Sequence, residues 1–367
     1  MLKSNKKITR LNPFQKAWSF WKESRLWTKI WTSFLIVCLL FVGSMYGIAQ
    51  WYIHKHSGEP LKMGVSFVPN YARRLGVDPQ ETMQAMINDL GVRQFRLVSY
   101  WEDIETEPGK YDFSEMDWQF AMVEAVGAKV SLSIGLRQPR WPECHMPKWV
   151  SGLPQDQKTW LPQLKDVMRA IIERYRSSPA LESYQLENEY FNTVFGICKD
   201  FDRSRLVDEY NFAKNLDPNH KVIVSRSNNA VGTPIGQPTP DEYAVSVYKR
   251  VWDKNVTKRY FEYPFPAWFY GFLAGTSEII KGKDMLIHEL QAEPWLPDEF
   301  NIVDAPLDEM YKSLTPERLE GRFIYGKATG MREIYLWGAE WWYQMKTTRN
   351  TPEFWDTAKA EFRKVEK

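Results

Sequence analysis

Eight short apolar segments, each followed by a segment of helical character, fill the chain from residue 61 to residue 364. The expected strands are Leu61–Val68, Arg93–Val98, Lys129–Ile134, Leu181–Glu187, Lys221–Ser225, Tyr243–Tyr248, Met285–Leu290 and Glu333–Trp337. Eight strands that alternate with helices over about 300 residues are typical of a (β/α)8 barrel, the TIM barrel. A doubly wound open sheet is the alternative, but the first strand–helix turn has no glycine-rich phosphate loop. The predicted fold class is therefore α/β, a TIM barrel.

Helix capping residues and closing glycines place the helices between these strands. The expected helices are 79–90, 114–126, 158–176, 203–214, 315–328 and 351–364. Residues 137–154 form a long loop rich in Pro and Trp, and the aromatic stretch 261–280 is expected to mix loop and helix.

An uncharged stretch, Ile30–Ile53, precedes the barrel. Its 24 residues exceed the roughly 20 that a membrane-spanning helix needs. Trp27 and Trp31 lie at one end, and Trp51 and Tyr52 at the other, where interfacial aromatic residues are expected. The stretch is therefore predicted to be one transmembrane helix.

The charge distribution predicts the orientation of this helix. Residues 1–30 contain eight Lys or Arg and a single acid, Glu23, so the positive-inside rule keeps the N-terminus in the cytoplasm. A cleaved signal peptide is the alternative, because Gly47–Ala49 resembles a cleavage site, but the basic region is longer than usual. The predicted parts are a basic cytoplasmic segment (1–29), a signal-anchor (30–53), a linker (54–60) and an extracytoplasmic barrel (61–367).

Composition excludes some functions and leaves others open. The chain beyond residue 30 has five more acidic than basic residues, which argues against a nucleic-acid partner. Seventeen Trp residues fit either a large aromatic core or a sugar-binding cleft. Neither the three cysteines nor the His, Asp and Glu residues have metal-site spacing, so no metal and no cofactor are expected.

Two glutamates are expected to share one cleft. Glu189 follows the segment Leu181–Glu187, and Glu289 lies within Met285–Leu290. These are the fourth and seventh predicted strands, which face each other across a barrel whose active site lies at the carboxyl ends of its strands. Glycoside hydrolysis needs such a pair, one acid for the leaving oxygen and one carboxylate for the anomeric carbon or for water.

The segment Arg96–Phe113 resembles the second-strand region of clan A glycoside hydrolases, which include family 5 cellulases and families 39, 42 and 10. Asn188-Glu189 is similar to the acid/base motif of that clan, and Glu289 to its nucleophile. The resemblance extends to three further residues of the clan's reacting-sugar subsite. They are Arg96 near the nucleophile, Tyr248 on the sixth strand and Trp337 beneath the sugar.

This resemblance implies a retaining glycoside hydrolase that cleaves a β-linked glycan by double displacement. Glu189 would act as general acid and then base, with its pKa raised by the charge of Glu289. Glu289 would be the nucleophile, held ionised by Arg96 and Tyr248. Asn188 would bind a sugar hydroxyl and Trp337 would stack on the ring. A transglycosidase on the same barrel and a catalytically silent polysaccharide-binding protein are the alternatives.

Several residues compete for these roles. Glu187 lies two positions before Glu189, so on a continuous strand it would point the same way. Glu293 follows the seventh strand and is an alternative nucleophile, whereas His288 is expected to point away from the mouth. His145 is a possible substrate contact. The tryptophans that could form either subsite walls or core are Trp101, Trp141, Trp149, Trp341 and Trp342.

The cysteines leave one question open. Cys144 and Cys198 follow neighbouring strands on the same side of the barrel, so a disulfide is possible if this domain lies outside the cell. Cys38 lies in the apolar stretch and is expected to be a small apolar residue. The sugar, the linkage and the choice between endo and exo cleavage stay open.

Overall fold

The computed structural model describes residues 12–151, 157–198, 201–228 and 236–365. The chain divides into two compact units, Met1–Ile48 and Ala49–Lys367. The first unit holds α1 (Pro13–Glu23) and most of α2 (Leu26–His56). The Asn12 side chain and that of Gln15 cap the start of α1 reciprocally.

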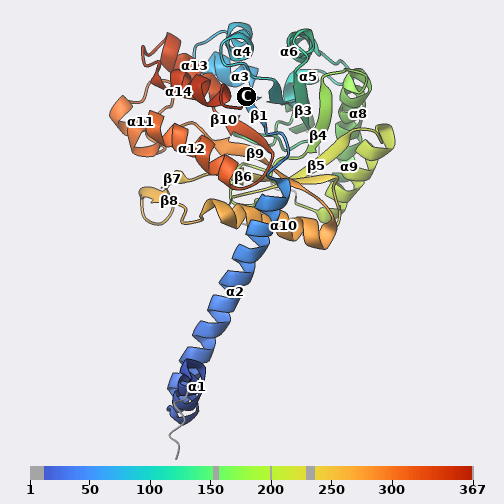
Figure 1. Cartoon of the computed structure of the whole chain (residues 1–367). Coiled ribbons are helices and arrows are strands. Elements are labelled where there is room, and N and C mark those ends of the chain that lie inside the picture. Colours follow the sequence, from blue (N-terminus) through green and yellow to red (C-terminus); the bar gives the residue numbers. More distant parts are fainter. Residues whose placement is uncertain (1–11, 152–156, 199–200, 229–235, 366–367) are drawn as a thin grey trace, which may run out of the picture. The chain divides into compact units, whose positions relative to one another are not determined.

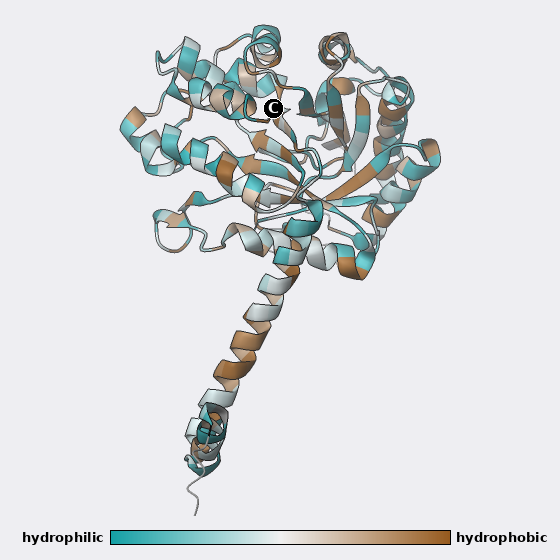
Figure 2. Ribbon diagram, viewed as in Figure 1, coloured by the Kyte–Doolittle hydropathy of each residue, from teal (hydrophilic) through white to brown (hydrophobic). Residues whose placement is uncertain are grey.

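Helix α2 is long and apolar enough to cross a membrane. The hydrophobic residues in its middle are visible in Figure 2, and the large apolar side chains between Phe34 and Val42 are exposed. The helix contains the predicted stretch 30–53 and extends beyond it at both ends.

Eight parallel strands form a closed barrel in the second unit, in the order β1-β10-β9-β6-β5-β4-β3-β2 (Figure 1). The strands are β1 (Lys62–Phe67), β2 (Gln94–Leu97), β3 (Lys129–Ile134), β4 (Leu181–Leu186), β5 (Lys221–Arg226), β6 (Glu242–Val247), β9 (Met285–Gln291) and β10 (Glu333–Trp337). The predicted TIM barrel is confirmed, and each predicted strand end agrees within one residue.

Helices follow the strands and cover the outside of the barrel. The long ones are α4 (Pro79–Asn88), α6 (Ser114–Ala125), α8 (Gln157–Tyr175), α9 (Arg203–Leu216), α10 (Ala267–Lys281), α12 (Pro316–Ala328) and α14 (Glu353–Phe362). Shorter helices occupy the loops: α3 (Pro69–Arg74), α5 (Trp101–Ile104), α7 (Lys148–Ser151), α11 (Leu307–Ser313) and α13 (Ala339–Thr347). Helix α10 makes up most of the aromatic stretch 261–280. Before α10 lies a hairpin of β7 (Arg250–Asp253) and β8 (Arg259–Glu262), which the sequence did not predict.

Two separate apolar clusters follow from the alternation of side chains along each strand. The larger one fills the space between the strands and the helices and contains Val222 and Val224 of β5. The smaller one lies inside the barrel and consists of Ile223, Ala244, Leu286 and Tyr335. The rest of the barrel interior, toward the carboxyl ends of the strands, contains polar side chains such as Arg96, Ser246 and Glu289.

The last turns of α2 belong to the barrel unit. The Tyr52 hydroxyl donates to Asp284 Oδ1 over 2.6 Å, and His56 Nε2 lies 2.9 Å from Glu278 Oε2. A Cβ on Gly330 would lie 2.7 Å from Ile53 Cγ1, so this glycine allows α2 to approach closely. Residues 54–56, predicted as linker, are therefore helical and packed against α10 and the start of β9.

Candidate active site

Glu189 lies in a tight turn directly after β4. The backbone leaves the strand through left-handed conformations at Glu187 (φ 55°) and Glu189 (φ 44°). The Glu189 N–H donates to Ser225 Oγ over 2.9 Å, which ties the turn to β5. Two neutral donors bind its carboxylate, the Ser246 hydroxyl at Oε1 and Asn192 Nδ2 at Oε2, the latter over 2.7 Å.

The environment of Glu189 favours its protonated form. Burial is the main cause that raises the pKa of this carboxyl, and the negative charge of Glu289 raises it further. The hydrogen bonds from Ser246 and Asn192 oppose this shift. A raised pKa was predicted from the charge of Glu289, but desolvation contributes more.

Glu289 lies on β9 and has charged and phenolic partners. Arg96 Nη1 of β2 donates to its Oε1 over 2.8 Å, and the Tyr248 hydroxyl donates to its Oε2 over 2.7 Å. Arg96 and Glu289 are both buried, so their ion pair is shielded from water. The structure brings Arg96, Tyr248 and Glu289 together, as the clan resemblance implied.

Asn188 precedes Glu189 and shares Arg96 with Glu289 as a hydrogen-bond partner. Its Oδ1 accepts from Arg96 Nη2 over 2.9 Å and from Gln185 Nε2 over 3.1 Å, which fixes the orientation of the amide. Its Nδ2 then points toward Glu143, at 3.3 Å from Oε1. Asn188 was expected to bind a sugar hydroxyl, and its amide nitrogen lies next to a third carboxylate, that of Glu143.

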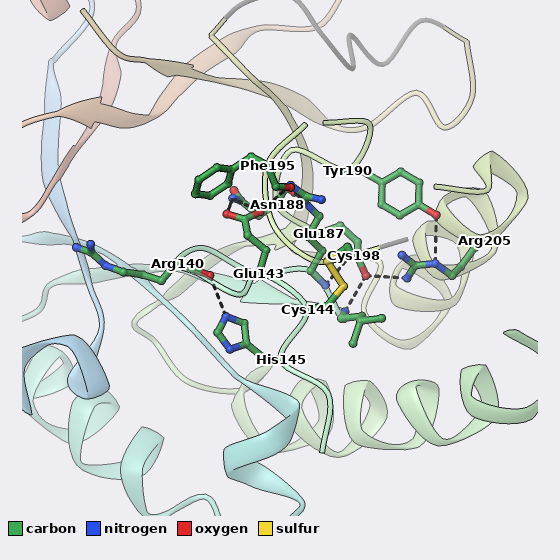
Figure 3. Close-up of a disulfide and its surroundings, with 12 residues drawn as sticks. Arg140, Glu143, Cys144, His145, Glu187, Asn188, Tyr190, Phe195, Cys198 and Arg205 are labelled. Atoms are coloured by element: carbon green, nitrogen blue, oxygen red, sulfur yellow. Dashed lines mark hydrogen bonds and ion pairs between the residues drawn. A yellow bond between two sulfur atoms is a disulfide. The ribbon is translucent and has the colours of Figure 1, made fainter. Parts of the chain in front are cut away.

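Glu143 is a site residue that the sequence did not indicate. It follows β3 with φ 73°, and its carboxylate pairs with Arg137 Nη2 over 2.9 Å (Figure 3). Burial raises its pKa well above the usual range, although Arg137 opposes this; the charges of Glu189 and Glu289 add to the rise. The residue lies in an irregular loop, where no strand periodicity reveals the direction of a side chain.

Glu187 does not share the surroundings of Glu189. Its carboxylate accepts from the N–H groups of Leu136 and Arg137 and pairs with Arg205 Nη1 over 2.9 Å (Figure 3). The expectation that both glutamates point the same way is wrong, because β4 ends at Leu186 and the turn breaks the two-residue period. Glu187 fastens the β3 and β4 loops to α9.

His288 faces the inside of the barrel, contrary to the sequence prediction. Its Nε2 lies 2.8 Å from Ser246 Oγ. Between β6 and β9 the register shifts, since Val245 pairs with Ile287 but Ser246 pairs with Glu289. This β-bulge adds one residue to β9, so His288 and Glu289 both reach the interior. Burial lowers the pKa of His288 well below its usual value, so the ring is neutral.

Glu293 has partners that differ from those of Glu289. Arg140 binds both of its oxygens, over 2.6 and 3.2 Å, and the Tyr71 hydroxyl donates to Oε2 over 2.7 Å. The guanidinium of Arg140 lies 3.3 Å from the Tyr71 ring centroid and 4.1 Å from that of Trp337. One side of Trp337, the residue expected beneath the sugar, therefore faces a cation.

A disulfide joins Cys144 and Cys198, with their Cα atoms 5.3 Å apart (Figure 3). The backbone N–H of Ile197 also donates to the carbonyl of Pro142 over 3.1 Å. The disulfide that the sequence left open is therefore present, and it links the β3 and β4 loops beside Glu143.

The remaining candidates divide between core and mouth. His145 stacks on Tyr100 and lies 2.9 Å from Glu102, so it stabilises the β3 loop. Trp101, Trp341 and Trp342 are buried, and Trp149 is half-buried in contact with the core. Trp141 is 61% exposed and is the most exposed tryptophan of that group.

The described residues contain no group of three or more His, Cys, Asp or Glu side chains that could hold a metal ion. The polar groups at the barrel mouth are instead two glutamates with different partners, an arginine and a tyrosine, at the ends of β2, β4, β6 and β9. These groups lie at one end of the closed parallel barrel.

Comparisons with known proteins agree with this fold. No known family profile matches the sequence, and the curated proteins contain no match. Among solved structures, a β-galactosidase from the haloarchaeon Halorubrum lacusprofundi has TM-score 0.55 and 14% identity over 83% of this chain and 58% of its own. Xylanase 10B from Thermotoga maritima has TM-score 0.53 and 12% identity over 88% of this chain and 99% of its own.

A third similar structure is Gan42B, a GH42 β-galactosidase from G. stearothermophilus. Its TM-score is 0.52 and its identity 12%, over 83% of this chain and 57% of its own. The chain thus spans less than two thirds of both β-galactosidases but nearly all of the xylanase. The predicted resemblance to clan A is confirmed at the level of the fold.

Proposed function

We propose that this chain is a retaining glycoside hydrolase that cleaves a β-linked glycan. The observation that carries the proposal is the difference between the two carboxylates. Glu189 is buried among neutral donors and has a raised pKa, whereas Glu289 pairs with Arg96 and Tyr248. A protonated acid beside a fixed carboxylate is the arrangement that double displacement requires.

In the first step Glu289 Oε attacks the anomeric carbon while Glu189 transfers its proton to the leaving oxygen. The bond to the leaving sugar breaks and a glycosyl–Glu289 ester forms. In the second step Glu189, now ionised, removes a proton from water, which attacks the same carbon and releases Glu289. Arg96 and Tyr248 orient the nucleophile through charge-assisted hydrogen bonds.

The location proposed for this reaction is outside the cytoplasm. Helix α2 would anchor the chain, with the basic segment 1–29 inside and the barrel beyond the membrane. The Cys144–Cys198 disulfide supports this location, because disulfides persist in oxidising compartments.

Transglycosylation is a second candidate, supported by a chain of aromatic rings beside the nucleophile. Trp295 contacts Tyr248 with centroids 5.5 Å apart, Phe195 lies 5.8 Å from Trp295, and Trp141 lies 5.9 Å from Phe195. Such rings can bind an acceptor sugar and exclude water. Transfer products formed in the presence of added oligosaccharide would distinguish this reaction from hydrolysis.

The test is a screen of the full-length chain in detergent against aryl β-glycosides and β-linked polysaccharides. The variants Glu189→Gln and Glu289→Gln are assayed beside it. Full activity of Glu289→Gln would contradict its assignment as nucleophile. Binding of a polysaccharide without hydrolysis by the wild type would favour the silent binding protein.

A further inference from the structure

Arg140 crosses from the β3 loop to the opposite side of the barrel mouth. Its guanidinium lies between the rings of Tyr71, which follows β1, and Trp337, at the end of β10. Its two terminal nitrogens bind Glu293, which follows β9. The β3 loop thus meets the segments after the neighbouring strands β1, β10 and β9 at one ion pair.

The Arg140–Glu293 pair is held from both ends. The N–H of Glu143 donates to the carbonyl of Arg140 over 2.8 Å, and Arg140 itself has φ 78°. At the other end, Gly338 has φ 109°, and a Cβ there would lie 2.4 Å from Glu293 Cβ. A glycine at position 338 therefore allows Glu293 to lie against the β10 turn and reach Arg140.

The barrel order places this pair across the mouth from Glu189. In the order β1-β10-β9-β6-β5-β4-β3-β2, β10 lies directly opposite β4. The seventh predicted strand, β9, is the neighbour of β10, so the expectation that the fourth and seventh strands face each other is off by one strand. Glu189 follows β4 and would protonate the leaving oxygen, so we place the leaving group on that side. The glycone then extends toward β10 and β1, where Arg140, Trp337 and Tyr71 stand.

We propose that the Arg140–Glu293 pair closes the glycone side beyond one sugar residue, so that the enzyme releases single sugars from the non-reducing end of its substrate. The inference rests on the proposed function. The guanidinium lies 4.1 Å from the ring centroid of Trp337, the residue expected beneath the reacting sugar, and covers one side of that ring. A second glycone residue would have to displace an ion pair fixed between two rings.

The experiment compares two kinds of chromogenic probe on the full-length chain in detergent. The first is a set of p-nitrophenyl β-monosides of galactose, glucose, xylose and mannose. The second is the p-nitrophenyl β-bioside of whichever sugar reacts, and reducing-end-labelled hexaoses with the same linkage. The wild type is expected to release nitrophenol from the monoside but not directly from the bioside, and to shorten hexaose one residue at a time.

The variant Arg140→Gly removes the closing side chain and suits the left-handed backbone at this position. We expect the ratio of bioside to monoside kcat/KM to rise by about tenfold or more, with disaccharide appearing among the products. The double variant Arg140→Gly/Glu293→Gln avoids an unpaired buried carboxylate and is expected to give the same change. Arg174→Ala, which breaks an exposed ion pair with Asp117, is the matched control and should keep the wild-type pattern.

Three results would overturn the inference. Direct cleavage of the bioside or internal cleavage of hexaose by the wild type would show an open cleft, while the hydrolase assignment would stand. Folded Arg140→Gly and double variants that still release only single sugars would show that Arg140 is not the barrier. Hydrolysis of no probe by the wild type would contradict the proposed function and the inference together.

Discussion

Ser246 is expected to set the pH at which the general acid works. Its hydroxyl donates to Glu189 Oε1, and His288 Nε2 lies 2.8 Å from the same Ser246 oxygen. Because His288 is neutral, its Nε2–H can donate to Ser246 while Ser246 donates to Glu189. The variant Ser246→Ala removes one of the two neutral donors that bind the Glu189 carboxylate.

The size of the effect follows from the loss of that hydrogen bond. The Ser246 hydroxyl lowers the pKa of Glu189 by stabilising its ionised form. A hydrogen bond to a charged group contributes about 1.5–3 kcal/mol, which corresponds to about one to two pKa units. The variant should therefore raise the pKa of Glu189 and keep it protonated to higher pH.

The assay is the pH dependence of kcat/KM on an aryl β-glycoside with a poor leaving group. The alkaline limb should move up by about one to two units in Ser246→Ala. Ser183→Ala is the control, because Ser183 is also buried in the barrel but hydrogen-bonds Ser131, and it should leave the limb in place. An unchanged limb, or one that moves to lower pH, would refute this account of Ser246.

Three further predictions concern the nucleophile, the barrel base and the disulfide. Tyr248→Phe loses the 2.7 Å bond to Glu289 and should lower kcat about 10- to 100-fold with a smaller change in KM. Burial raises the pKa of Glu333 to about 7, so its ionisation destabilises the fold as pH rises from about 4.5 to 7. Glu333→Gln should therefore stabilise the chain by up to about 3 kcal/mol at pH 8 but not at pH 4, measured as a melting-temperature difference. Replacing Cys144 and Cys198 by Ser opens a 54-residue loop and should cost up to about 4 kcal/mol, visible in denaturant titrations.

The barrel could be predicted because its signals are local. Alternating apolar segments and closing glycines located the eight strands of the barrel, and Glu189 and Glu289 were then chosen by the rule that active sites lie at the carboxyl ends of strands. Arg96 and Tyr248 could be assigned through the clan resemblance, and both contact Glu289.

The surroundings of the carboxylates could not be predicted, since they depend on backbone irregularities. The β-bulge on β9 turns His288 inward, and the turn after β4 separates Glu187 from Glu189. Glu143 and Arg140 lie in an irregular loop whose path is set by a disulfide and an ion pair to distant parts of the chain. No periodicity in the sequence encodes such contacts.

Glu289 is proposed to form a covalent bond with the sugar while Glu189 transfers the proton. The most direct test is to incubate the protein with a 2-deoxy-2-fluoro β-glycoside of the sugar it hydrolyses and to locate the adduct by peptide mass spectrometry. If Glu289 is the nucleophile, the protein carries one glycosyl group, attached to Glu289. An adduct on Glu143, Glu187 or Glu293, or turnover that yields the inverted anomer without an adduct, would contradict it.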